Sequence, residues 1–168
     1  MPLTSKIVPY DASWPSRYRD EAARLRAVFD CALLEIHHIG STAVPGLSAK
    51  PEIDILVVVS NTYSADSWAE TLTTLRYRRG RDLSLGHLFY KRDIEGVRTH
   101  KIHVCLAGYP KIKEMLNFRD YLRMHDETRD DYQALKIELE RRNTAGIGEY
   151  LADKEPFIRA VLEQIERD

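Results

Sequence analysis

A seven-residue run, apolar except for one acid, constrains this chain more than any other stretch. The run is IDILVVV, from Ile53 to Val59, and Pro51 comes two residues before it. A short apolar run rich in Val and Ile is typical of a strand that is buried on both faces of a sheet. Such a strand needs cover on each side, so the pattern predicts a layered α/β or α+β domain.

Three more strands are predicted around this one. Apolar and polar residues alternate over 32–39, which is the period of a strand. Residues 88–92 and 97–106 have the pattern of two hairpin strands that turn at Ile94-Glu95-Gly96. We expect these strands to join the buried strand in a mixed sheet.

Helices are expected to flank this sheet. Ser13 is suited to cap a helix and Pro15 to its first turn, which predicts a helix at about 14–30. Apolar residues at helical spacing predict another helix from Asn61 to Tyr77. After Pro110 the pattern stays helical to the end of the sequence.

Length and composition suit one globular domain. The chain has 168 residues, of which 43% are hydrophobic and 30% charged. That is enough apolar material for one sizeable core. We therefore expect a single domain over residues 1–168, with a core at about 14–107 and a helical cap at about 110–168.

Charge and hydropathy argue against several classes of partner, although a local basic patch stays open. The net charge is −1, from 25 Lys and Arg against 26 Asp and Glu, whereas strong nucleic-acid binding needs a basic surplus. No apolar stretch approaches the roughly 20 residues of a membrane span, and the start lacks the apolar run of a signal peptide. Cys31 and Cys105 lack CxxC spacing and are expected to be free thiols. We expect a cytoplasmic protein without a membrane partner, and the oligomeric state stays open.

Two acids stand at the entrance of the buried strand. Glu52 and Asp54 flank Ile53, so on a strand they share one face, with Cα atoms roughly 6.5–7 Å apart. Carboxylates on one face are suited to hold a divalent ion such as Mg²⁺, which prefers oxygen ligands and substrate phosphates. The same pattern also fits an ordinary strand entrance with two solvated acids.

A Gly-Ser pair precedes these acids by about ten residues. Gly40 allows the backbone to approach a ligand closely. If Ser41 and Thr42 open a helical turn, their amides and hydroxyls are suited to hold a phosphate group. A tight turn capped by Ser41 explains the pair equally well.

Several motifs together resemble the GrpB family, and the resemblance covers nearly the whole chain in order. Gly-Ser ahead of an acid-apolar-acid strand is also the layout of the wider nucleotidyltransferase fold. The motifs that carry the family resemblance are VPYDASWPSRY (8–18), HIGSTAVPGLSAKPEIDI (38–55), RTHKIHV (98–104), NFRDYLR (117–123), and Tyr150 with KEPFI (154–158).

The resemblance implies a nucleotidyltransferase-like mixed sheet with added helices and a C-terminal helical extension. In that fold Gly-Ser holds the triphosphate, and acids hold the metal. Asp54 carries over firmly, whereas family members often have an apolar residue in place of Glu52. A third carboxylate usually comes from a later strand, where this chain has THKIHV. His103 is our candidate there, and Lys101 stands where the family more commonly has His.

The motifs and the family resemblance together give a predicted site. Asp54, Glu52 and His103 are the predicted catalytic and metal-binding residues. The metal is expected to be Mg²⁺, with Mn²⁺ or Zn²⁺ as alternatives because imidazole suits them better. The predicted substrate-binding residues are Gly40, Ser41, Thr42, Lys50, Arg119 and Lys154. As alternatives, Arg119 pairs with Asp120 to lock its helix to the sheet, and Lys50 and Lys154 are ordinary solvated lysines.

Three functions are compatible with this site. The first is a metal-dependent nucleotidyltransferase that moves a nucleotidyl group from an NTP to an unidentified small acceptor. The second is a catalytically reduced module that binds a nucleotide or phosphorylated metabolite, suggested by the missing third carboxylate. The third is a protein partner domain, suggested by the fusion of similar domains to dephospho-CoA kinase in some bacteria.

Overall fold

The predicted central strand, β2 (Ile53–Val59), lies inside a mixed sheet. The computed structural model describes residues 3–167, which contain a five-stranded sheet in the order β1-β2-β5-β4-β3. β2 pairs antiparallel with β1 and parallel with β5. The remaining strands are β1 (Leu33–Ile39), β3 (Arg78–Arg79), β4 (His87–Ile94) and β5 (Val97–Leu106).

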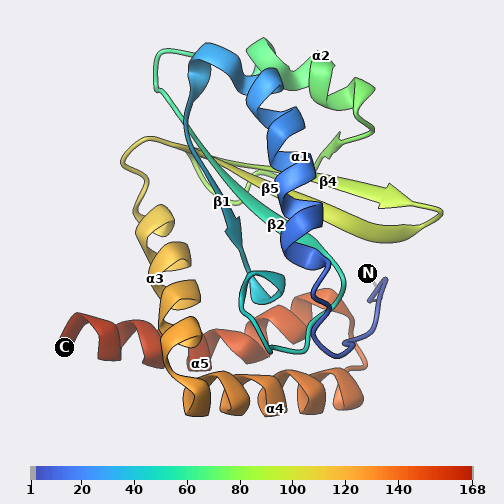
Figure 1. The fold of residues 1–168 in the computed structure, drawn as a ribbon, viewed down its shortest axis with the longest axis vertical. Helices are drawn as coiled ribbons and strands as arrows, with labels where there is room; N and C mark the ends of the chain where they lie inside the picture. Colours follow the sequence, from blue (N-terminus) through green and yellow to red (C-terminus); the bar gives the residue numbers. More distant parts are fainter. Residues whose placement is uncertain (1–2, 168) are drawn as a thin grey trace.

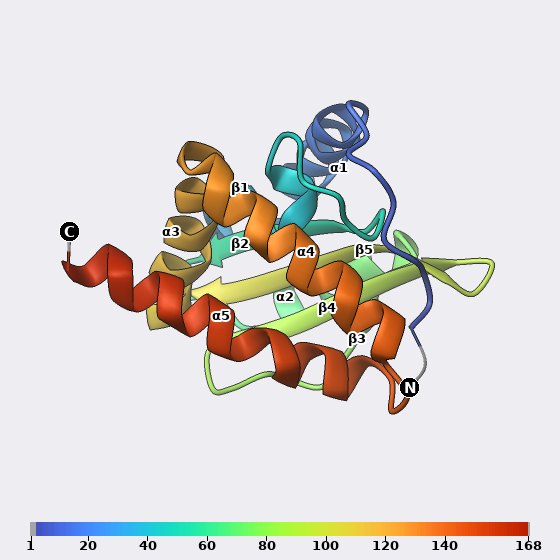
Figure 2. The same ribbon diagram turned by 90° about the horizontal axis from the view of Figure 1, so that it is seen from below.

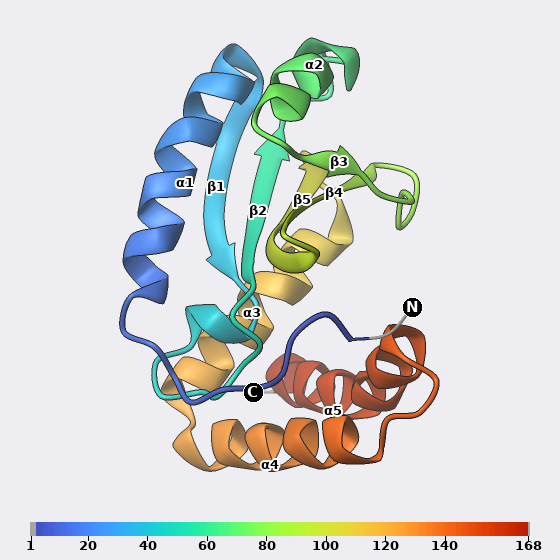
Figure 3. The same ribbon diagram turned by 90° about the vertical axis from the view of Figure 1, so that its right-hand side faces the viewer.

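β2 is covered on both faces, as its apolar sequence predicts. Its odd-numbered residues, Ile53 to Val59, pack into the cluster under α1 (Trp14–Phe29) and α2 (Asp66–Thr74). Leu56 and Val58 point to the opposite face and pack against α3 (Pro110–Met124). Figure 3 shows α1 on one face of the sheet and α3 behind the other. Because side chains alternate on a strand, Asp54 lies on the α3 face.

Two more helices lie across one end of the sheet. They are α4 (Asp126–Arg142) and α5 (Ile147–Arg167), drawn in orange and red in Figure 1. Figure 2, which is seen from below, shows them side by side in front of the sheet. The short helix η2 (Ser41–Ala43) and the loop after it lie against them, where Leu47 and Tyr132 share an apolar cluster. The end of β1 and the start of β2 thus meet the helices at one place.

The helix predicted at 61–77 is shorter in the structure. α2 begins only at Asp66, because the Ser60 side chain forms a local turn in which its hydroxyl accepts the amide of Thr62 at 3.3 Å. It ends at Thr74, shortly before Arg76, which has a φ of 65°. A left-handed backbone cannot continue a right-handed helix. The two-residue edge strand β3 was not predicted.

The division of a single domain into a core at about 14–107 and a helical cap at about 110–168 stays a prediction. α3 packs on the sheet, whereas α4 and α5 lie at its end, so the residues after 110 cover two sides of the core. Over residues 3–167, none of the helices combines the length and the apolar character needed to cross a membrane.

Candidate functional site

The Gly-Ser pair forms a sharp turn at the end of β1. Gly40 has φ 72° and ψ −173°, a combination that is essentially restricted to glycine. A Cβ atom at this position would lie 2.7 Å from Oδ2 of Asp54. The bare backbone at Gly40 therefore allows the turn to pass directly over the Asp54 carboxylate, and Ser41 then opens η2.

Both acids at the start of β2 contact the same lysine. Lys101 on β5 is the Cα partner of Asp54 in the parallel register. Its Nζ lies 3.1 Å from Oε2 of Glu52 and 3.1 Å from Oδ1 of Asp54. The second oxygen of Glu52 accepts a hydrogen bond from the Ser5 hydroxyl at 2.7 Å. An ammonium group thus joins the two carboxylates that were predicted to share a metal.

Lys101 bridges Glu52 and Asp54, and attraction within this bridge keeps both Lys101 and Asp54 charged. Burial raises the pKa of Asp54, but Lys101, assisted by His103, outweighs it and brings the pKa to about 2. Burial likewise lowers the pKa of Lys101, but Asp54 and Glu52 more than offset this and raise it. At neutral pH Asp54 is therefore an anion and Lys101 a cation.

His103 stands beside Asp54 and is held by a second histidine. Its Nε2 lies 3.9 Å from Oδ1 of Asp54. Its Nδ1 is 2.9 Å from Nε2 of His87, which comes from β4. Burial, followed by repulsion from His103 and Lys111, lowers the pKa of His87 to about 4. His87 is therefore neutral at pH 7. One of its ring nitrogens then donates a hydrogen bond and the other accepts one.

A cavity of about 280 Å³ opens over Asp54 between the sheet, α3 and α5. Its walls are partly apolar, with Phe118 from α3, Tyr132 from α4 and Ile158 from α5. Six of the predicted site residues line it, namely Gly40, Ser41, Asp54, His103, Arg119 and Lys154. The structure thus brings together residues from five separate stretches of the sequence.

Three lysines lie close to the Ser41 side of this cavity; Lys154 lines it, whereas Lys136 and Lys50 lie nearby without lining it. Lys136 on α4 is 2% exposed, and its Nζ donates to Oγ of Ser41 at 2.9 Å and to the Ser48 carbonyl at 2.6 Å. Lys50 and Lys154 both place Nζ near the ring of Tyr150, at 4.3 and 4.7 Å from its centroid. In the described part of the chain, none of these three lysines forms an ion pair with a carboxylate.

Burial lowers the pKa of each of these lysines, and repulsion between neighbouring lysines adds to it. For Lys136, burial has the largest effect, followed by repulsion from Lys154 and Lys50, and the pKa falls to about 7. For Lys154, burial and repulsion from Lys101 bring the pKa to about 8. Burial also lowers the pKa of Lys50. A proton on Lys136 or Lys154 is therefore costly in the ligand-free protein, and an anion beside these lysines would favour their charged form.

Three of the predicted residues lie near the cavity without lining it. The Thr42 hydroxyl donates to the Glu52 carbonyl at 3.3 Å and lies 2.9 Å from Nε2 of His38, so it holds the turn. Lys50 contacts Tyr150, and Glu52 contacts Lys101 and Ser5, as described above. Their roles in ligand binding stay predictions.

Arg119 lines the cavity and also connects helix to sheet. It donates through Nε and Nη2 to Asp120 at 2.7 and 3.0 Å. Its Nη1 donates to the His38 carbonyl on β1 at 3.0 Å. The nearby Arg123 donates to the Ala43 carbonyl at 2.9 Å. Both arginines therefore fix α3 against β1 and the Gly-Ser turn, and Arg119 forms part of the cavity wall.

The bridge decides whether a divalent metal fits. Metal ions bind carboxylates at about 2.0–2.6 Å and repel ammonium groups. Here the ammonium of Lys101 occupies the space that joins Glu52 and Asp54, and Ser5 holds the other oxygen of Glu52. Across residues 3–167, no three His, Cys, Asp or Glu side chains come together as a metal-binding group. In this arrangement the residues do not fit a divalent metal, and the metal role of Glu52, Asp54 and His103 stays a prediction.

Sequence reasoning missed Lys136 and the bridging role of Lys101. Lys136 has a detectable signal, because it occupies the buried stripe of α4 together with Tyr132 and Leu139. A lysine at an apolar-stripe position is rarely buried unless it has a polar partner. Lys101 gives no such signal, because its contacts depend on which strand pairs with β2.

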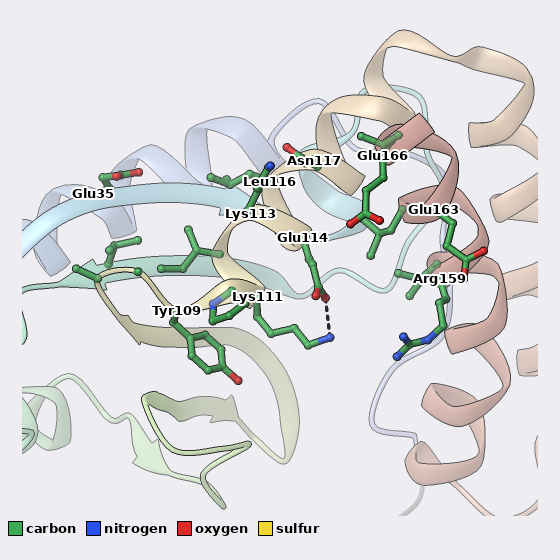
Figure 4. Close-up of a pocket in the computed structure, with 18 of the residues that line it drawn as sticks. Glu35, Tyr109, Lys111, Lys113, Glu114, Leu116, Asn117, Arg159, Glu163 and Glu166 are labelled. Carbon is green, nitrogen blue, oxygen red and sulfur yellow. Dashed lines mark hydrogen bonds and ion pairs between the residues drawn. The ribbon is translucent and has the colours of Figure 1, made fainter. Parts of the chain in front are cut away.

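Figure 4 shows a second, larger groove of about 970 Å³ on the outer side of α3 and α5. Its charged side chains have both signs, with Glu163, Glu166 and Arg159 from α5 and Lys113 from α3. None of the nine predicted site residues lines it. The groove adjoins the cavity over Asp54, because Lys111, Glu114, Ile158 and Leu162 line both.

Solved structures place the fold in a known class. The chain is similar to the poly(U) polymerase Cid1 in its MgGTP-bound structure, with a TM-score of 0.55 and 15% identity over 82% of this chain and 45% of that one. The structure of Cid1 with the UTP analog UMPNPP gives the same TM-score at 14% identity, over 88% of this chain and 48% of that one. At such identities the likeness concerns the fold alone. The sheet and its Gly-Ser turn thus define a nucleotidyltransferase-type fold.

Relatives of higher identity define the family. The model of the GrpB protein family matches residues 4–164, and the chain belongs to that family. The crystal structure of the conserved protein GrpB from Enterococcus faecalis has a TM-score of 0.86 and 28% identity, over 95% of this chain and 96% of that one. UPF0157 protein YqkA of Bacillus subtilis is 32% identical over 96% of this chain. A dephospho-CoA kinase of Mycobacterium tuberculosis is 30% identical over 91% of it.

The length of the relatives differs from that of this chain. The chain spans 47% of YqkA and 44% of the dephospho-CoA kinase. It spans 80% of UPF0157 protein BH1888 of Halalkalibacterium halodurans, to which it is 33% identical. These matches identify the shared domain, and they do not transfer the kinase activity named for the longer protein.

The Gly40 turn gives a first prediction. Gly40→Ala is expected to destabilise the protein by about 1–3 kcal/mol, because it forces a side chain into a glycine-only conformation. The new Cβ would also displace the Asp54 carboxylate. Urea denaturation followed by circular dichroism measures the loss. Gly148→Ala is the control, since a Cβ there meets nothing within 4 Å. Equal stability of both variants would contradict the close approach to Asp54.

The buried Lys136 gives a second prediction. Its pKa is lowered to about 7 from 10.5, so the unfolded chain binds more protons than the folded one between these pH values. The free energy of unfolding should therefore rise with pH across that window. Facing groups, namely Lys50, Lys154 and Glu140, act on the same proton. Between pH 7 and 9, Lys136→Met is expected to remove on the order of 1–2 kcal/mol of this rise.

Urea titrations at both pH values measure this effect. The control is Lys113→Met, which removes an exposed lysine on α3. If Lys136→Met and Lys113→Met give the same pH dependence as the unaltered protein, then Lys136 does not have a lowered pKa.

Proposed function

We propose that this cavity binds the phosphate groups of a nucleotide or of another phosphorylated metabolite. The observation that carries the proposal is the set of lysines around Ser41. Lys154 lies close enough to Lys136 to contribute to the lowering of its pKa, and neither lysine forms an ion pair with a carboxylate within residues 3–167. Burying like charges together is costly, and a bound phosphate group would offset that cost.

The shape of the turn supports the same ligand. Gly40 brings bare backbone to the cavity wall, and Ser41 presents a hydroxyl to which Lys136 donates. A hydroxyl beside an ammonium is suited to contact a phosphate oxygen, since charge-assisted hydrogen bonds are the stronger ones. The cavity of about 280 Å³ also has apolar walls at Phe118 and Tyr132, which suit the non-phosphate part of a ligand.

Nucleotidyl transfer to a small acceptor is the second candidate. It is supported by the fold class and by the position of His103 on the cavity wall. In this reaction an acceptor oxygen forms a bond to the α-phosphorus, the bond to pyrophosphate breaks, and the acceptor loses a proton. His103, held by His87 and next to Asp54, is placed to take that proton. The lysines would offset the charge on the departing pyrophosphate. A metal-dependent form of this reaction additionally requires Lys101 to leave the two acids.

Calorimetric titration with each NTP tests the binding proposal. The unaltered protein is expected to bind at least one NTP, and Lys154→Met is expected to weaken binding by about 10- to 100-fold, as for the loss of one charge-assisted contact. Lys113→Met should change the affinity little. Binding at pH 8 should also take up protons, because a phosphate ligand raises the pKa of Lys136 and Lys154. Titration in buffers of different ionisation enthalpy measures that uptake.

Absence of binding by every NTP and by inorganic tripolyphosphate would exclude this ligand class. Equal weakening by Lys154→Met and Lys113→Met would place the ligand elsewhere, or show that binding is non-specific.

Pyrophosphate release separates transfer from simple binding. The protein is incubated with the NTP that it binds and a panel of hydroxyl and amine acceptors. If it is a transferase, His103→Ala and Asp54→Asn should each lower release by about 100-fold or more, as for the loss of a general base, while NTP affinity changes only a few-fold. Binding without release for any acceptor would favour the binding module instead.

A further inference from the structure

The bridge between Glu52 and Asp54 has a consequence for the cation that this site uses. β5 runs parallel to β2, and Lys101 is in register with Asp54. Side chains at matched positions of neighbouring strands point to the same face. Lys101 therefore faces the cavity side of the sheet together with both acids, and its backbone is fixed by strand pairing to β2 and β4.

The ammonium group of Lys101 lies between the two carboxylates and contacts both. Nζ is 3.1 Å from one oxygen of each carboxylate, which are distances of direct ion pairs. The three side chains are only partly exposed, at 26% for Lys101, 10% for Glu52 and 17% for Asp54. The Ser5 hydroxyl fixes the remaining oxygen of Glu52. A divalent ion between these acids would lie against the ammonium, so the two cations exclude each other.

The remaining charge of the site reduces the need for a metal. Divalent ions commonly neutralise the phosphate groups of a bound nucleotide. Here the lysines around Ser41 are suited to that role, because Lys50, Lys136 and Lys154 form no ion pair with a carboxylate within residues 3–167. The charged groups concerned are the lysines Lys50, Lys101, Lys136 and Lys154 and the carboxylates of Glu52, Asp54 and Glu140.

We propose that Lys101 is the resident cation of this site and replaces a divalent metal between Glu52 and Asp54, so that phosphorylated ligands bind without metal. This inference rests on the proposed function for its second half. Its first half, the exclusion of metal by Lys101, concerns the protein without any ligand and can be tested by itself.

Manganese binding to the ligand-free protein tests the first half. Mn²⁺ is titrated into the unaltered protein, and the unbound ion is measured by electron paramagnetic resonance. The unaltered protein is expected to leave Mn²⁺ unbound, whereas Lys101→Met should bind it at least about tenfold more tightly, because the two carboxylates lose their internal partner. Lys101→Arg, which keeps the positive charge, should behave like the unaltered protein. Adding Asp54→Asn to Lys101→Met should remove the new binding.

Two results would overturn the proposal. One is Mn²⁺ binding by the unaltered protein that Asp54→Asn removes and Lys101→Met does not strengthen. The other is the absence of Mn²⁺ binding in every folded variant, which would show that the two acids do not form the place of a metal. Circular dichroism checks folding, and Lys101→Gln serves as the second neutralising variant if Lys101→Met does not fold.

Tripolyphosphate binding in EDTA tests the second half. The unaltered protein is expected to bind it with the same affinity, within about threefold, with and without the chelator. Loss of binding in EDTA would contradict metal-independent binding. If tripolyphosphate and all NTPs fail to bind in either condition, the proposed function is wrong, while the Mn²⁺ titration still decides the role of Lys101.

Discussion

Burial of β2 on both faces is the constraint on which the rest of this structure depends. The strand is covered by α1 and α2 on one side and by α3 on the other. Each of its side chains is therefore fixed to one of the two faces. Asp54 must point to the α3 side, next to the turn that ends β1. The parallel partner β5 then places Lys101 and His103 on that same side. The site follows from the packing of one strand.

The charges of the site are arranged at a cost to stability. A well-packed protein core rarely buries lysines without carboxylate partners, yet α4 holds Lys136 in its buried stripe between Tyr132 and Leu139. Real proteins break such rules at functional sites. The pairing of Lys101 with two acids and the crowding of the other lysines therefore have different meanings. The first is a satisfied cluster, and the second lacks carboxylate ion pairs, which is the basis of the proposed phosphate site.

The relatives share the architecture of this chain, but that similarity does not establish its chemistry. The GrpB match and the E. faecalis structure cover almost the whole chain, so the architecture is shared throughout. The likeness to Cid1 concerns the fold alone. Chemistry has to be argued from side chains, because one fold supports many functions. In this chain, Lys101 between Glu52 and Asp54 is the side-chain feature that most affects that argument.

The sequence by itself determined the elements and much of the site. The period of its apolar residues fixed the buried strand, the hairpin of β4 and β5 and the helices around them, because local periodicity reflects which face is buried. It also pointed to six residues that do line the cavity. Tertiary structure alone decided the rest. Strand order placed Lys101 between Glu52 and Asp54, and the docking of α4 brought Lys136 to Ser41. These contacts join residues 47 and 95 positions apart, counting Lys101 from Asp54 and Lys136 from Ser41, and no local pattern specifies partners at such separations.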